Sequence, residues 1–219
     1  RVQRPLTPEG LDCPHLYILH PPGGLVSGDN LRLQADMQEN ACAVLTTPSS
    51  GKFYRARDNG TLQVQHNRFT LAAGSSLEYL PQDTIAFEGC HARMITRIDL
   101  AVDARCVAWD LLCLGRPAAG EGFSYGQVDQ RLDVWRDGRP IYIERNQFIG
   151  GDPLLEARWG LGGCGVSGTW LATVQLDRQQ MDDLRESLTD CPELALTQRN
   201  GLLIGRYLGL HAEHARNTF

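Results

Sequence analysis

The sequence predicts a mainly β protein with a small C-terminal α+β portion. Hydrophobic and polar residues alternate through most of residues 16–149, a period of two that places successive side chains on opposite faces of a sheet. The 23 glycines and 11 prolines are more turn residues than a helical bundle would use. The pattern changes after the glycine-rich stretch at 160–168. Among the 219 residues we therefore expect a β body over 1–165 and, packed on it as one structural unit, a strand–helix–strand portion over 166–219.

Short strands joined by turns account for the β body. Alternation is clearest at 31–37, 62–65 and 141–144, and clusters of glycine, proline and asparagine separate these runs. Asp137 and Gly138 lie between two such runs and predict a two-residue hairpin turn, because a type I′ turn needs residues that tolerate positive φ. Strands this dense suit a stacked or helically wound β architecture as well as a sandwich.

The C-terminal portion combines strands with a helix. Residues 166–176 have the pattern of a strand. Asp177 and Gln180 then form a capping-box pattern, and apolar residues at helical spacing follow them. Strand patterns at 194–197 and 202–208 suggest a closing hairpin, and the last residues read as a helix cut short. The first residues contain no initiator Met and no signal-peptide pattern, so we expect the natural protein to extend beyond both ends.

Composition argues against several classes of function. The net charge is −5 and no block of like charge is present, which argues against a nucleic-acid partner. The longest apolar runs fall well short of the ~20 residues that a membrane-spanning helix requires, so we expect a soluble protein with no membrane role. The 7 cysteines form no C-x-x-C pair, a usage typical of reduced thiols in the cytoplasm.

Two short motifs match enzyme signatures without their structural context. Residues 122–126 match the G-x-S-x-G elbow of serine hydrolases, but a strand-like run follows where the elbow needs a helix. Such a hydrolase would use Ser124 as nucleophile with His211 or His214, and it stays an alternative interpretation. Residues 160–165 match the dinucleotide motif G-x-G-x-x-G, and again a strand pattern follows instead of a helix. A glycine-rich bend explains the second motif better.

Soft metal ligands occur only in pairs along the sequence. A closed structural metal site needs four ligands, so we interpret each pair as a reduced thiol beside a surface histidine, or as two surface histidines. The pairs are Cys13 with His15, Cys90 with His91, and His211 with His214.

Two carboxylates inside apolar runs are harder to explain. Asp110 lies within 107–114, and Glu144 follows Ile-Tyr-Ile. A charged side chain in such a place is unfavourable unless a partner, a cation or water receives it. A buried salt bridge, for instance with Arg116 or Arg145, explains these carboxylates at least as well as a metal ion or a water-filled channel.

Four stretches of the chain carry motifs that follow one another in a fixed order. They are 19–29 with His-Pro-Pro-Gly-Gly, 45–55 with Ser-Ser-Gly-Lys-Phe-Tyr-Arg, 77–87 with Tyr-Leu-Pro-Gln-Asp, and 108–116 with Trp-Asp-Leu-Leu-Cys. Together they resemble the signatures of the urease accessory protein UreD family, also called UreH. Further motifs between 120 and 145 also look like this family and account for the hydrolase-like match. The resemblance is dense over roughly residues 1–150 and loose beyond them.

The resemblance implies a largely β, helically wound body that acts as a non-enzymatic scaffold in nickel delivery. Members of this family bind the accessory protein UreF and, through it, the GTPase UreG, and they dock on the urease apoprotein. The resemblance implies no tightly bound cofactor, because nickel is a cargo that crosses an internal, water-filled passage. Carboxylates suit such a passage, since oxygen ligands hold a divalent cation weakly enough to release it.

The family pattern points to three residues as polar lining of that passage. They are Asp29, Asp110 and Glu144. Where the pattern around Asp29 has a second glycine, this chain has Ser27, a change that affects local turn geometry and leaves the expected function intact.

Four basic residues also match family positions. They are Lys52, Arg55, Arg116 and Arg145, which we interpret as pairing partners or as contacts with partner proteins. A β-rich protein-binding module with no metal role is the other alternative to a nickel-delivery scaffold.

Overall fold

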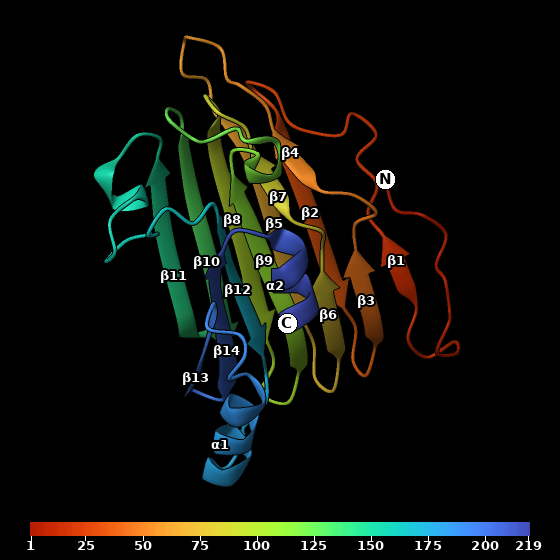
Figure 1. Ribbon diagram of the computed structural model, residues 1–219. Coiled ribbons are helices and arrows are strands. Elements are labelled where there is room, and N and C mark those ends of the chain that lie inside the picture. Colours follow the sequence, from red (N-terminus) through yellow and green to blue (C-terminus); the bar gives the residue numbers. More distant parts are fainter.

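Two β-sheets stacked face to face form the body of the protein (Figure 1). The computed structural model describes residues 1–219 except for the side chain of Ala118. The five-stranded sheet has the order β11 (Arg139–Ile149), β10 (Gln127–Arg136), β8 (His91–Leu100), β5 (Gln63–Leu71) and β2 (Asn30–Met37). The nine-stranded sheet has the order β1 (His15–Tyr17), β3 (Cys42–Thr46), β6 (Ser76–Leu80), β9 (Arg105–Leu114), β12 (Val166–Ala172), β14 (Leu202–Gly209) and β13 (Leu194–Arg199). Its remaining strands are β7 (Thr84–Ala86), which pairs with β9, and β4 (Gly51–Phe53), which pairs with β7.

The chain alternates between the two sheets as it advances. Strand β2 lies in the five-stranded sheet, β3 and β4 lie in the nine-stranded sheet, and this exchange continues to β10. The successive strands β2, β5, β8 and β10 are parallel, and so are β3, β6 and β9. Parallel neighbours need a crossover connection, and here a strand of the opposite sheet provides it. The predicted mainly β, helically wound architecture is therefore confirmed.

An antiparallel hairpin ends this winding. Strands β10 and β11 join through Asp137 and Gly138, whose φ angles are 47° and 72°, as predicted for this turn. Strands β12, β14 and β13 then pair antiparallel and extend the nine-stranded sheet beyond β9. The helical elements are the 3₁₀ helices η1 (Pro117–Ala119) and η2 (Pro153–Leu155) and the α-helices α1 (Arg178–Ser187) and α2 (Ala212–Thr218).

The two α-helices belong to the C-terminal portion. Helix α1 begins with the predicted capping box, in which Asp177 and Gln180 each accept the other's backbone N–H at 2.9 Å. Helix α2 lies over β9 on the outer face of the nine-stranded sheet, where Ala215 and Phe219 pack with Leu111 (Figure 1). Neither helix is long and apolar enough to cross a membrane.

The space between the sheets holds two apolar clusters. One is built around Phe69 and Ile98, and the other around Phe53 and Leu112. All four of these side chains are fully buried. Both clusters draw side chains from both sheets, because the period of two sends every second residue of a strand inward. Burial of these apolar faces is the main force that holds the sheets together.

Glycine at position 138 sets the turn between β10 and β11. Gly138 has a φ of +72°, a left-handed conformation that disfavours a Cβ, and it has open space around it. Gly122 is a matched control, because it is also exposed with open space but has no positive φ. We expect Gly138→Ala to lower the free energy of unfolding by about 1 kcal/mol. Gly122→Ala should change it by less than about 0.5 kcal/mol, and equal losses in chemical denaturation would contradict the turn assignment.

Candidate functional site

A layer of polar side chains separates the two apolar clusters of the interior. On β9, Ala108 belongs to one cluster and Leu112 to the other, and Asp110 faces inward between them. In the same sheet Asp110 lies beside Thr169 of β12, which lies beside Arg206 of β14. The facing sheet contributes polar residues of β10 and β11 at the same level. We call the following residues the interior polar layer: Asp110, Gln130, Glu144, Asn146, Thr169 and Arg206.

Within this layer, Glu144 is the charged group with the most hydrogen-bond and ion-pair partners. Its carboxylate is buried, with 7% of the residue exposed, and it lies 3.0 Å from the guanidinium of Arg206. The hydroxyls of Thr169 and Tyr142 both donate to it at 3.0 Å, and the amide of Asn146 donates at 3.3 Å. The buried salt bridge considered from the sequence therefore exists for Glu144, but its partner is Arg206.

The two arginines suggested as partners from the sequence pair elsewhere. Arg145 follows Glu144 on β11, so it points to the opposite face of the strand, where it pairs with Asp133. Arg116 pairs with Glu121 beyond the end of β9. The expectation of a bridge from either arginine to Asp110 or Glu144 was therefore wrong.

Asp110 differs from Glu144 because it has no cationic partner among the side chains that the structure describes. The side chain is half-buried, and its hydrogen-bond partner is Gln130. Burial raises the pKa of Asp110 to about 6, and the nearby charge of Glu144 adds to this effect, while the hydrogen bond from Gln130 opposes it. The amide of Asn146 donates to Gln130 at 3.1 Å, which links the two carboxylates through a chain of polar groups.

Further polar groups lie next to the layer on its β5 and β8 side. The amide of Asn67 donates to the hydroxyls of Tyr79 and Thr96 at 3.2 Å each. Tyr79 pairs with Ala108, two residues before Asp110 on β9; burial raises the pKa of its hydroxyl, and the charge of Asp110 raises it further. The side-chain oxygen of Asn67 is shielded from solvent and has no hydrogen-bond partner in the part of the chain that the structure describes. The polar region thus runs across four strands, from β5 to β11.

Asp29 lies outside the interior polar layer. Its side chain is exposed at the turn before β2, where the carboxylate accepts the backbone N–H of Val26 at 2.9 Å. Ser27 occupies this turn without a positive φ, and its hydroxyl accepts the backbone N–H of Arg57 at 2.7 Å. The serine is therefore accommodated where the family pattern has glycine.

The four basic motif residues also lie away from the interior polar layer. Arg116 and Arg145 have the ion pairs described above, and the guanidinium of Arg116 also lies 5.2 Å from the ring centroid of Phe87. The guanidinium of Arg55 lies 5.7 Å from the ring centroid of Tyr125. The Lys52 ammonium on β4 lies 3.4 Å from the carbonyl oxygen of Ser50.

The two enzyme-like motifs lack the geometry of their signatures. Ser124 is exposed and its hydroxyl donates to the carboxylate of Glu88, and no described contact joins it to a histidine. His214 instead faces the hydroxyl of Tyr207 at 3.2 Å. Strand β10 follows Ser124, and β12 follows the glycines at 160–165, so neither motif opens a helix.

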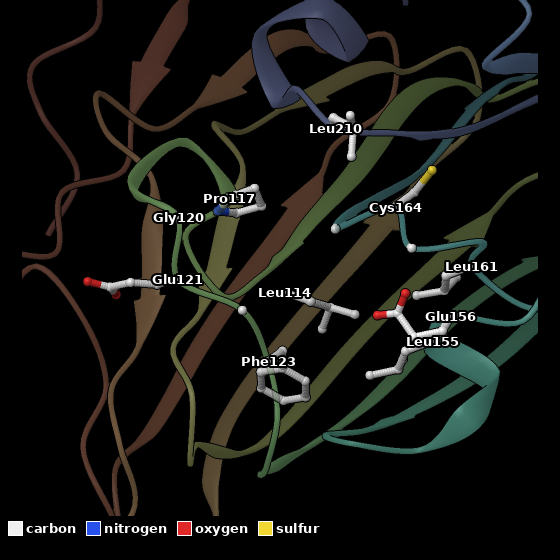
Figure 2. A pocket seen from close by; sticks show the side chains of 13 residues that line it. Leu114, Pro117, Gly120, Glu121, Phe123, Leu155, Glu156, Leu161, Cys164 and Leu210 are labelled. Atoms are coloured by element: carbon white, nitrogen blue, oxygen red, sulfur yellow. The ribbon is translucent and has the colours of Figure 1, made fainter.

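Two pockets lie at the surface of the nine-stranded sheet and its connections. Figure 2 shows the smaller pocket, of about 260 Å³, where Leu114 and Phe123 face Leu155 and Leu161 of the β11–β12 connection. The larger pocket, of about 840 Å³, lies beside α2 and includes Leu210 at its wall. Neither of these pockets includes Asp110 or Glu144 among its lining residues.

Sequence reasoning missed most members of the interior polar layer. The residues not selected from the sequence are Gln130, Asn146, Thr169 and Arg206. For Gln130 a signal exists, because it occupies an inward position between Val128 and Leu132 in an alternating strand. Arg206 offers no such signal, since only the pairing of β12 with β14 and the stacking of the sheets bring it to Glu144.

Comparisons with known proteins agree on one family. The model of the family described as UreD urease accessory protein matches residues 1–219. "Urease accessory protein UreD" of Saccharophagus degradans is 44% identical over 224 residues, which cover 100% of this chain and 76% of that protein. The protein of the same name from Dechloromonas aromatica is 45% identical, covering 100% and 77%. That of Marinobacter nauticus is 43% identical, covering 98% and 73%.

The raised pKa of Asp110 predicts how stability depends on pH. The folded-state pKa is about 6 and the ordinary value is 3.8, so the group favours the folded protein only while it is protonated. This contribution is fully present below about pH 4 and is lost as the pH rises through about 6. Asp110→Asn removes the free-energy cost of burying an ionised carboxylate. As the pH rises from about 4.5 to about 7.5, the free energy of unfolding of this variant, measured by urea denaturation, should increase by about 2 kcal/mol relative to that of wild type.

Ile98→Val is the control for this measurement, because it changes a fully buried side chain of the same interior that cannot titrate. It should lower the free energy of unfolding by about 0.5–1.5 kcal/mol at both pH values. A difference between Asp110→Asn and wild type that does not change with pH would contradict the raised pKa.

Proposed function

Because this chain belongs to the UreD family of urease accessory proteins, we propose that it acts as a non-catalytic scaffold that helps to deliver nickel to urease. In this proposal the protein docks on the urease apoprotein and on the accessory protein UreF, and through UreF it works with the GTPase UreG. Nickel crosses the protein at the interior polar layer and does not stay bound. The proposed compartment is the cytoplasm, which the free state of the 7 cysteines supports, because reduced thiols are typical of it.

The observation that carries this proposal is the Asp110 carboxylate between two apolar clusters with no described cationic partner. A carboxylate in such surroundings, close to the second carboxylate of Glu144, is stabilised by any cation that reaches it. Divalent ions such as Ni²⁺ accept oxygen ligands, and the amide oxygen of Gln130 belongs to the same layer. The charge and the ligand type therefore both suit a cation in this layer.

Arg206 explains why the layer would suit transit better than storage. Its guanidinium neutralises Glu144 at 3.0 Å and leaves Asp110 as the carboxylate that attracts a cation. Two unpaired carboxylates would hold a divalent ion more tightly, whereas one carboxylate with neutral oxygen ligands releases it more readily. The Arg206 side chain is 58% exposed, so the layer reaches solvent on this side.

Exposed apolar side chains around the pocket of Figure 2 support a docking role. Trp159 is 85% exposed and Leu154 is 53% exposed, and both belong to the connection between β11 and β12. Leu210, at the wall of the pocket, is 54% exposed (Figure 2). Leu155 and Leu161 of the same connection line this pocket, and exposed apolar surface with an aromatic residue is typical of a protein–protein interface.

Asp110→Asn separates a role in nickel transit from a structural role, because it removes the charge and keeps the shape and hydrogen-bonding capacity of the side chain. We expect the variant to co-purify with UreF, UreG and the urease subunits as wild type does. The nickel content and activity of the urease matured with it should fall several-fold, since the cation loses its charged ligand. Metal analysis of urease and co-purification must be performed on the same preparation.

Asp133→Asn is the matched control, because it removes a carboxylate from the outer face of β10, where Asp133 pairs with Arg145. It should leave both assembly and nickel content unchanged. Normal assembly with normal nickel content in Asp110→Asn would contradict a nickel role and favour a binding module without one. Loss of assembly in Asp110→Asn would instead show that this carboxylate holds the fold.

A further inference from the structure

A group of metal-ligand side chains converges at the β1 edge of the nine-stranded sheet. Strands β1 and β3 are parallel, and their register pairs His15 with Val44, so Cys13 comes beside Cys42. Ala43 and Leu45 of β3 belong to the interior cluster, which places Cys42 on the outer face of the sheet. This group is thus on the opposite side of the sheet from the interior polar layer.

Three ligand atoms of this group lie close enough to share one ion, and the fourth, the sulfur of Cys42, lies beside the sulfur of Cys13. The oxygen of Glu9, the sulfur of Cys13 and a ring nitrogen of His15 all lie within 4.8 Å of one another. The sulfur atoms of Cys13 and Cys42 are 2.8 Å apart. The Nε2 atom of His15 is shielded from solvent, makes no hydrogen bond in the described structure, and lies 3.4 Å from the Glu9 carboxylate. A nitrogen donor is therefore directed at the cluster without another partner.

We propose that Glu9, Cys13, His15 and Cys42 bind one borderline or soft divalent transition-metal ion, for which Zn²⁺ is the best match. Two thiolates, one imidazole and one carboxylate are four ligands of the types that tetrahedral zinc sites use. The sulfurs must separate by about 1 Å to reach tetrahedral positions around zinc, a movement that side-chain rotation provides. Glu9 is exposed and the other three side chains are half-buried, so the ion can enter from solvent.

The metal site would cross-link the N-terminal segment, the residues before β1, to the nine-stranded sheet. This segment folds back along β1 through single bridges of Val2 with Ile18 and Leu6 with His15. Glu9 comes from the loop between Leu6 and His15, whereas Cys42 comes from β3. One ion would cross-link this loop to β1 and β3, whereas the single bridges alone hold the N-terminal segment weakly. This inference is independent of the proposed role in nickel transit.

A second group of metal-ligand side chains is a poorer candidate. Cys191, Glu193 and His214 also lie within 4.8 Å of one another, but the group has one thiol. His214 already faces the Tyr207 hydroxyl at 3.2 Å, and the Cys191 thiol contacts Thr218 at 3.8 Å. Its donors are therefore engaged, and it serves as the comparison site in the test.

Cobalt binding to the reduced, metal-free chain tests the proposal. Co²⁺ replaces Zn²⁺ in tetrahedral thiolate sites and gives thiolate-to-cobalt charge-transfer bands and intense visible bands. We expect one Co²⁺ per chain with the intensity of two thiolates, and loss of the bands when Zn²⁺ is added. Cys13→Ser and Cys42→Ser should each remove about half of the charge-transfer intensity or more, and weaken binding by at least about tenfold.

Three further variants separate a lost ligand from a lost fold. Glu9→Gln changes an exposed loop residue outside the strands, so it should weaken binding and leave the circular dichroism spectrum unchanged. Cys164→Ser alters a half-buried cysteine elsewhere, and Cys191→Ser alters the comparison site. Both variants should keep the full signal.

Several results would overturn the proposal. These are absence of tetrahedral bands, bands that keep their full intensity in Cys42→Ser, and bands that disappear in Cys191→Ser. A disulfide is the competing fate of two sulfurs 2.8 Å apart. If peptide mapping finds a disulfide between Cys13 and Cys42 after incubation with equimolar Zn²⁺ in a cytosol-like glutathione buffer, the pair is a redox element and the metal site is refuted.

Discussion

The ion pair between Glu144 and Arg206 is the interaction on which the interior of the protein depends. It joins β11 of one sheet to β14 of the other, and so connects the end of the parallel winding to the antiparallel C-terminal strands. Removal of Arg206 would leave the Glu144 charge with too little compensation, because this carboxylate is almost inaccessible to water. With Glu144 neutralised in this way, Asp110 remains the charge that the layer does not balance. Within this layer, Asp110 is therefore the one carboxylate without a described cationic partner.

The helical winding explains how a polar layer can cross an otherwise apolar interior. Each turn of the chain adds parallel strands to both sheets in a fixed register, so residues at one level of successive strands form a continuous row. Polar residues occupy two adjacent inward levels of the five-stranded sheet, where Asn67 hydrogen-bonds to Thr96 beside it and Asn146 to Gln130 beside it. Apolar clusters fill the levels on both sides. A polar layer between two apolar clusters follows from this arrangement.

Sequence patterns predicted the features that depend on neighbouring residues, and did not predict those that depend on the winding. The turn at Asp137 and Gly138 and the capping box at Asp177 follow from local backbone chemistry, and both are present. The partner of Glu144 could not be found in the same way, because Arg206 comes from the last strand of the chain. Short-range spacing also treated Cys13 with His15 as an isolated pair, whereas the register of β1 with β3 adds Cys42.

The central claim is that Asp110 is a carboxylate inside the protein that a divalent cation can stabilise, and a direct titration of that carboxyl group tests it. Carbon-13 NMR of the carboxyl signal, assigned with Asp110→Asn, gives the pKa with and without a diamagnetic divalent ion such as Zn²⁺, measured in a Cys13→Ser, Cys42→Ser background. The account predicts a pKa of about 6 without the ion and a lower value with it, because the cation favours the ionised form. A pKa near the ordinary 3.8 that the ion does not change would contradict the account.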